Sequence, residues 1–209
     1  MSRCRLFGLL VLFLSGCAGI ESRRYLEPAF HGKAPGRVAV LPFDNQSVDL
    51  VGPELLRRMV QGGLGRSGYE CVPLDRVDEA LKTLGLTDGG QLRAVPSQGL
   101  RSVLGVEGLF YGDVEEFSFL NVGFAVRRIV RLRLKFELSS TGELLWEDAG
   151  QGLTEYFTLK KERAWRAFME GLVVREAENL FRTPLMPEAR EAVRRLLLSL
   201  PPYGMRVNN

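Results

Sequence analysis

Four residues near the start of the chain have the types and spacing for covalent lipid attachment. The segment Leu14–Cys17, which reads Leu-Ser-Gly-Cys, follows a basic start with Arg3 and Arg5 and an apolar run. A charged region, an apolar run and small residues before a cut are the parts of a secretory signal. With a cysteine directly after the cut, the pattern is typical of a bacterial lipobox, in which the thiol is diacylated, the signal is removed and the new amino terminus is acylated. We therefore expect residues 1–16 to be a signal peptide and Cys17 to carry lipid.

Two other interpretations of this segment are a transmembrane helix and a plain secretory signal with a coincidental cysteine. A transmembrane span needs about 20 apolar residues, and the run here is about half that length. Ala18 follows the cysteine, whereas an aspartate there retains lipoproteins of enteric bacteria in the inner membrane. We therefore expect a lipid anchor in the outer membrane, with the protein facing the periplasm and surface exposure as the alternative.

Three acidic residues lie together after a strand-like segment. Alternation along a strand puts Asp113 and Glu115 on one face, beside Glu116. Two carboxylates on one face could serve acid/base chemistry or bind a divalent cation. No third ligand or partner base is evident in the sequence, so a solvated strand end is the favoured interpretation.

A basic row, formed by Arg131, Arg133 and Lys135, alternates with apolar residues on a later strand. Such a row could bind phosphates, anionic lipid headgroups or another protein. It lacks the aromatic side chains on which single-stranded nucleic acids stack. A strand face that forms salt bridges with acids on neighbouring strands is favoured, and a protein contact is the main alternative.

The composition argues against catalysis and against a nucleic-acid partner. The chain has one histidine, His31, in a segment without periodicity, so Ser-His and Cys-His pairs and histidine metal sites are implausible. We predict no catalytic residues, no metal and no cofactor. Loss of residues 1–16 removes two of 28 basic residues and none of 25 acidic ones, which leaves a net charge of +1. This near-neutral balance gives no support to nucleic-acid binding.

Two further motifs have structural interpretations. Gly63–Gly68 matches the GxGxxG pattern, but a phosphate site needs these glycines after a strand and at the start of a helix. Here they are expected to close a helix and precede a strand. Cys71 is the single cysteine left after Cys4 and Cys17 are assigned, and its strand-like surroundings indicate a buried structural thiol.

Hydrophobic periodicity predicts the elements that position these residues. We expect a tether over 17–36, one α/β domain over 37–200 whose helical end begins at about 159, and a tail over 201–209. The predicted order is β-α-β-α-α-β-β-β-α-α, with strands and helices at the following residues: strands 37–43, 69–72, 108–119, 130–138 and 143–147, and helices 51–61, 75–84 (capped by Asp75), 97–104, 165–180 and 187–200. This order predicts a mixed sheet of about five strands with helices mainly on one face. The other face, which carries the basic row, would be open or covered by a partner.

The segment Arg37–Asn45 resembles the first strand and loop of a group of envelope proteins. The group includes the amino-terminal domain of TolB, the curli-secretion lipoprotein CsgG and lipoprotein activators of penicillin-binding proteins. The resemblance sharpens toward one bacterial lipoprotein family near this group, through Gly68–Asp78, Leu84–Asp88, Leu100–Gly105 and Gly142–Glu147. It implies a TolB N-terminal-like fold and supplies no catalytic residues. A pore like that of CsgG is not expected, because the one candidate hairpin, residues 117–138, has a highly charged strand.

These observations favour a non-catalytic interaction module in envelope assembly, secretion or transport. Its partner would be an envelope protein, such as a CsgG-like lipoprotein, and its candidate partner surface consists of the following residues: Asp44, Asn45, Arg131, Arg133 and Lys135. One alternative is a protein that binds a small ligand or a metal, or an enzyme, through the region of Asp113 and Glu115. Another alternative is a structural homo-oligomer.

Overall fold

The computed structural model describes residues 24–122, 124–157 and 185–204. Its strands are β1 (Tyr25–Leu26), β2 (Arg37–Val40), β3 (Asp44–Asn45), β4 (Glu70–Cys71), β5 (Gly108–Asn121), β6 (Ala125–Leu138) and β7 (Leu144–Phe157). Its helices are α1 (Phe30–Lys33), α2 (Gly52–Arg66), α3 (Leu74–Lys82), the 3-10 helix η1 (Gly89–Ala94), α4 (Ser97–Leu104) and α6 (Met186–Leu197). The expected signal peptide, Cys17, the predicted helix over 165–180 and the last residues of the tail, 205–209, lie outside the described residues.

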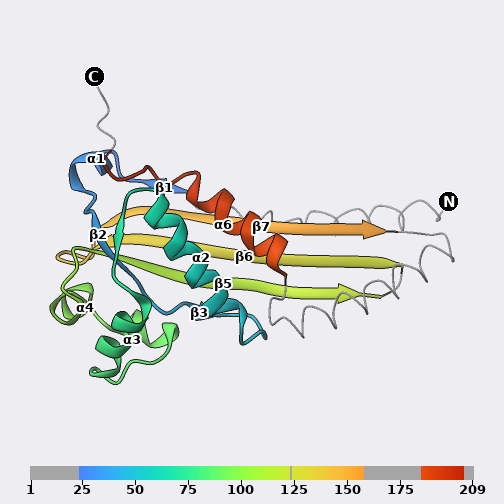
Figure 1. Cartoon of the computed structure of the whole chain (residues 1–209), viewed down its shortest axis with the longest axis horizontal. Helices are drawn as coiled ribbons and strands as arrows, with labels where there is room; N and C mark the ends of the chain where they lie inside the picture. Colours follow the sequence, from blue (N-terminus) through green and yellow to red (C-terminus); the bar gives the residue numbers. More distant parts are fainter. Residues whose placement is uncertain (1–23, 123, 158–184, 205–209) are drawn as a thin grey trace, which may run out of the picture.

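The strands form one mixed sheet, which confirms the predicted fold class. Seven strands take part in the order β1-β7-β6-β5-β2-β4, with β3 paired to β5. Strands β4, β2 and β5 are parallel, whereas β5, β6, β7 and β1 are antiparallel. The long strands β5, β6 and β7 run well past α2, α3 and α4 (Figure 1). Helices α3 and α4 therefore lie at one end of the sheet, near β2, whereas α6 crosses β6 and β7 (Figure 1).

The sheet is covered on both faces at that end, whereas helices mainly on one face were expected. Val38 and Val40 pack with α2 and α6, but Ala39 and Leu41 pack with α3, α4 and η1. Successive side chains of a strand point to opposite faces, so an uninterrupted apolar strand such as β2 needs cover on both. On β6 the predicted alternation is confirmed, since Val130, Leu132, Leu134 and Phe136 are buried in the α2 and α6 core.

The ordered domain begins before residue 37, so the expectation of a tether through residue 36 is wrong for its second half. Tyr25 and Leu26 pair with β7, and Phe30 of α1 is buried against Phe136. The sequence of this segment has no period, because β1 is exposed and α1 buries only Phe30. His31, on α1, is exposed.

Two predicted helix ends also differ. Helix α2 continues through Gly62, Gly63 and Gly65 to Arg66 instead of ending at the glycine cluster. A Cβ atom on Gly63 would lie 2.2 Å from Leu197 of α6, so this glycine permits close helix packing. Asp75 lies inside α3 and makes no cap bond, because the helix begins one residue earlier at Leu74.

Helix α6 lies directly on β7. A Cβ atom on Gly150 or Gly152 would come within 2.1 Å or 2.0 Å of the backbone carbonyl oxygens of Ala192 and Glu188, respectively. The two glycines thus provide the space in which the helix crosses the strand. This contact fixes the predicted terminal helix, expected over 187–200 and observed as α6, against the sheet. No helix among the described residues has both the length and the apolar character needed to cross a bilayer.

Candidate functional site

The predicted residues Asp44 and Asp113 lie side by side at one end of the helix-covered region. Strand β3 pairs in parallel with β5 so that these two residues are in register. Arg93 of η1 donates one hydrogen bond to each carboxylate, over 2.5 Å to Asp44 and 2.9 Å to Asp113. The two aspartates raise the pKa of the exposed Arg93 guanidinium, with Asp113 the larger cause. Sequence reasoning missed Arg93, because it is far from both partners in the chain.

Asn45 organises the loop that follows. Its side-chain amide nitrogen donates to the carbonyl of Asp49, and its Oδ1 accepts hydrogen bonds from the backbone and the hydroxyl of Ser47. Asp49 in turn accepts hydrogen bonds from the backbone N–H groups of Val51 and Gly52 at the start of α2. The loop of residues 46–51, called here the β3–α2 loop, is therefore tied down at both ends by side-chain bonds.

The predicted acids and two members of the basic row pair with each other across the strands. Arg133 lies 2.8 Å from Glu115 and 3.4 Å from Glu147, and its side chain is 19% exposed. Arg131 donates to the amide oxygen of Gln151. This is the ion-paired strand face that the sequence favoured for the basic row. The solvated strand end that it favoured for the acids is not observed, because Asp113, Glu115 and Glu116 lie within β5 and their side chains are 18–26% exposed.

A β-bulge at residue 115 produces this arrangement. The register of β5 against β6 shifts between Val114 and Glu116, so that Glu116 lies opposite Arg131. Glu116 therefore reaches the same face as Asp113 and Glu115, and it pairs with Arg127 over 3.1 Å. Each of the three carboxylates thus has an arginine partner. The described residues hold no group of three His, Cys, Asp or Glu side chains that could bind a metal ion.

A polar cleft of about 390 Å³ separates η1 and α4 from β5 and β6. Its charged and hydroxyl-bearing lining residues are the following: Asp44, Arg93, Ser97, Tyr111, Asp113, Lys135 and Glu137. Ser97 donates a 3.1 Å hydrogen bond to Glu137, yet burial raises the pKa of that carboxyl above its ordinary value. Among the described residues, no carboxylate forms an ion pair with Lys135. The cleft therefore presents both a cation and acidic groups to any molecule that enters it.

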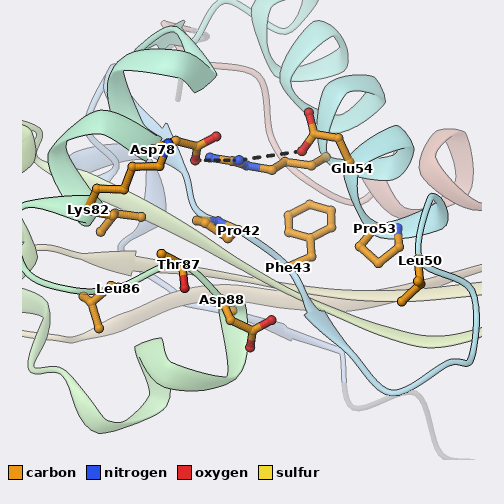
Figure 2. A pocket seen from close by; sticks show the side chains of 13 residues that line it. Pro42, Phe43, Leu50, Pro53, Glu54, Asp78, Lys82, Leu86, Thr87 and Asp88 are labelled. Carbon is orange, nitrogen blue, oxygen red and sulfur yellow. Dashed lines mark ion pairs between the residues drawn. The ribbon is translucent and has the colours of Figure 1, made fainter.

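A second cleft, of about 260 Å³, lies on the other side of residues 42–44. Figure 2 shows Pro42 and Phe43 between two rims, one with Lys82, Leu86 and Thr87 and the other with Leu50 and Pro53. Arg57 also lines this cleft. Its side chain is 3% exposed and forms ion pairs with Asp78 (2.8 Å) and Glu54 (3.8 Å).

Arg57 also donates two hydrogen bonds to the carbonyl of Val40, at 3.2 and 3.0 Å. This one side chain therefore joins α2, β2 and α3. No local sequence signal marks Arg57, since its partners are spread over three elements.

Cys71, on β4, is half-buried. Its thiol donates a weak hydrogen bond to the carbonyl of Gln61, and burial raises the pKa of Cys71 to about 11. A thiol with a raised pKa is a poor nucleophile at neutral pH. This supports the structural role that the sequence indicated.

The chain matches the model of the protein family described as "Putative lipoprotein GNA1162-like" over residues 26–180. A curated relative from Neisseria meningitidis serogroup B (strain ATCC BAA-335 / MC58), "Putative lipoprotein NMB1124/NMB1162", is 28% identical over 108 residues. These residues are 52% of this chain and 50% of the relative, so the match spans about half the length of the curated relative.

Two solved structures extend the comparison. Lipoprotein GNA1162 from Neisseria meningitidis has a TM-score of 0.55 at 21% identity, over 69% of this chain and 99% of that chain. A PelC dodecamer from Paraburkholderia phytofirmans has a TM-score of 0.48 at 14% identity, over 86% of this chain and 98% of that chain. The similarity to GNA1162 shows that the mixed α/β fold is shared.

Proposed function

This chain belongs to the GNA1162-like family of lipoproteins, and from that premise we propose that it is a lipid-anchored envelope protein that acts as a non-catalytic interaction module. The resemblance to a lipoprotein family is thereby confirmed, whereas the relations to TolB and to CsgG stay predictions. The module would serve envelope assembly, secretion or transport by binding another envelope protein. A CsgG-like lipoprotein is one candidate for that partner.

Family membership supports a lipid anchor, and the segment Leu14–Cys17 supplies its attachment site. Cys17 lies outside the described residues, so the acylated thiol, the outer membrane and the periplasmic orientation are parts of the proposal. The three acyl chains of a mature lipoprotein exceed the two signals needed for stable anchoring. The variant Cys17→Ala is expected to leave the membrane fraction of lysed cells. Retention of the variant in that fraction would contradict the anchor.

The β3–α2 loop is the surface that best supports an interaction role. Val48 and Leu50 are 96% and 89% exposed, although both are apolar. Asn45 and Asp49 hold the loop that carries them through the hydrogen bonds described above. A loop that is already ordered loses less conformational freedom on binding than a flexible one, and apolar side chains that become buried supply the driving force. This exposed apolar pair on a fixed loop is the observation that carries the proposal.

The predicted partner surface changes accordingly. Asp44 and Asn45 position the loop, and Lys135 lies in the polar cleft beside Asp44. Arg131 and Arg133 are engaged by neighbouring strands and contribute less. We therefore propose that the contact is centred on the β3–α2 loop and extends over the polar cleft.

Photo-crosslinking in intact cells tests this surface. A benzoylphenylalanine at Val48 is expected to give reproducible adducts with an envelope protein, which mass spectrometry identifies. The same probe at Arg101, an exposed residue on α4, is the matched control and is expected to give none of these adducts. Equal adducts from both positions, or none from Val48, would contradict the proposed surface.

A small-ligand function is the second candidate, and the polar cleft is the observation that favours it. Lys135 could hold an anionic group while Asp113 and Glu137 face a cationic one, which suits a zwitterionic ligand. A thermal-shift screen of amino acids and short peptides tests this. A shift that Asp113→Ala abolishes would favour the ligand-binding function, and the absence of any shift would favour the interaction module.

A structural homo-oligomer is the third candidate function, which the sequence left open. Light scattering during gel filtration of the chain without its acyl groups measures the oligomeric state. A monomer would exclude this candidate and leave the other two.

A further inference from the structure

A second exposed surface, on the outer side of the helices, combines an apolar floor with basic rims. Helices α2 and α6 enclose a groove of about 660 Å³. Its floor contains Gly62, Gly63 and Leu197, and Leu198 at its end is 71% exposed. Two arginines line each side, Arg58 and Arg66 from α2 and Arg190 and Arg194 from α6.

The charge of this groove is only partly neutralised. Arg58 pairs with Glu54, and Arg194 pairs with Glu191. Within the described part of the chain, Arg66 and Arg190 have no carboxylate partner. Both are exposed. The groove therefore keeps a net positive charge on both rims around an apolar centre, and the partner that complements it is anionic and partly apolar.

The groove opens at the end of the domain where the described chain begins. Trp146 of β7 lies in register with Leu26 of β1, and its indole N–H donates to the hydroxyl of Ser199, just after α6. The backbone N–H of Tyr203 donates a hydrogen bond to the carbonyl of Ser67, at the end of α2, and the Tyr203 ring lies against Gly36. The C-terminal ends of α2 and α6 thus lie beside the first described residues (Figure 1).

The distance to the proposed anchor is short. Arg24, the first residue that the structure describes, lies seven residue steps after Cys17. Even fully extended, these steps span at most about 25 Å. A tether over the whole of 17–36 would have let the domain stand away from the bilayer, whereas a reach this short keeps the end that carries the groove close to the lipid headgroups.

We propose that the α2–α6 groove docks on the bilayer surface and binds anionic phospholipid headgroups. Arginine side chains at the rims can extend to phosphates while their aliphatic stems, with Leu197 and Leu198, contact the acyl boundary. The orientation relative to the membrane rests on the proposed lipid anchor, but headgroup binding by the groove does not. A basic residue near an anionic surface contributes enough attraction for about a fivefold change in partitioning.

Vesicle flotation tests the groove without the anchor. The chain lacking residues 1–16 and carrying Cys17→Ser has no acyl group, and it is mixed with vesicles of phosphatidylcholine alone or with 30% phosphatidylglycerol. We expect binding only to the vesicles with phosphatidylglycerol, and weaker binding at high salt. The double variant Arg66→Glu/Arg190→Glu should lower the partition coefficient at least tenfold.

The matched control is Lys82→Glu/Arg101→Glu, which makes the same change in charge on exposed residues of α3 and α4. It should change partitioning less than twofold, and urea unfolding should show that both double variants remain folded. Equal losses in the two variants, or binding that does not depend on phosphatidylglycerol, would overturn the proposal. If the groove variant keeps vesicle binding but loses a protein adduct in cells, the groove is a protein site and the proposal is wrong. Failure of the anchor appears separately, in the fractionation of Cys17→Ala.

Discussion

Replacement of Arg57 should destabilise the domain far more than replacement of its neighbour Arg58. The Arg57 guanidinium is buried, bonds twice to the carbonyl of Val40 and lies 2.8 Å from Asp78. Arg58 is 71% exposed, and its ion pair with Glu54 joins residues of the same helix. The two arginines are adjacent on α2. The variants Arg57→Met and Arg58→Met therefore compare the loss of a buried guanidinium with the loss of an exposed one.

The expected loss follows from the groups that Arg57→Met leaves behind. The Val40 carbonyl loses both donors, and hydrogen bonds from a charged group contribute about 1.5–3 kcal/mol. Breaking a fully buried ion pair costs about 3–5 kcal/mol. Because Asp78 is 38% exposed, water solvates part of its charge, and we expect a loss of about 2–4 kcal/mol in the free energy of unfolding. An exposed i,i+4 pair contributes about 0.3–0.5 kcal/mol, so Arg58→Met should lie within that range.

Urea unfolding followed by circular dichroism measures both variants. The loss for Arg57→Met corresponds to a fall in Tm of roughly 5–15 °C for a domain of this size. Adding Asp78→Leu to Arg57→Met should restore part of the loss, because it removes the unpaired carboxylate. Equal losses for Arg57→Met and Arg58→Met, or no recovery in the double variant, would refute the conclusion that Arg57 links the three elements.

Three further measurements test the packing and the titratable groups. Gly152→Ala should lower the free energy of unfolding, measured in urea, by about 1–3 kcal/mol, because the added Cβ would meet the carbonyl of Glu188. Gly65→Ala should not lower it, because a Cβ there meets no atom within 4 Å. The raised pKa of Glu137 means that the folded state keeps this proton to higher pH than the unfolded chain. The free energy of unfolding should therefore fall as pH rises from 4.5 through the folded-state pKa, and Glu137→Gln should lack this component. A pKa of about 11 for Cys71, against an ordinary 9.0, predicts that its reaction with Ellman's reagent at pH 8 is about 100-fold slower than in denaturant.

Local pattern was sufficient to predict the elements whose side chains repeat regularly. The alternation of Val130 through Phe136 predicted a strand with one buried face, and α4 was predicted at its observed bounds, Ser97–Leu104. It was not sufficient for α1, where Phe30 enters the core alone, because a period cannot be recognised from one residue. The same limit explains why the apparent tether includes part of the domain.

Tertiary contacts decided the features that pattern could not predict. Arg57 and Arg93 became recognisable only when the fold brought Val40, Asp44 and Asp113 beside them. The continuous apolar run of β2 requires cover on both faces, but which helices supply it on each face depends on tertiary contacts. The bulge at residue 115 has no local sequence signal, yet it decides which acids face the basic row.

The ion pairs within the basic row also determine where contact with a partner protein can contribute the most binding free energy. A partner carboxylate that recruits Arg133 must displace Glu115 or Glu147, so it exchanges one ion pair for another and gains little. Lys135 has no such pair among the described residues, and it lies in the cleft that Asp44 also lines. An acidic group of a partner could therefore bind Lys135 without breaking an existing bridge, while Val48 and Leu50 become buried at the β3–α2 loop. For these reasons the binding energy of an envelope partner should concentrate at the β3–α2 loop and at Lys135 in the polar cleft rather than at Arg131 and Arg133.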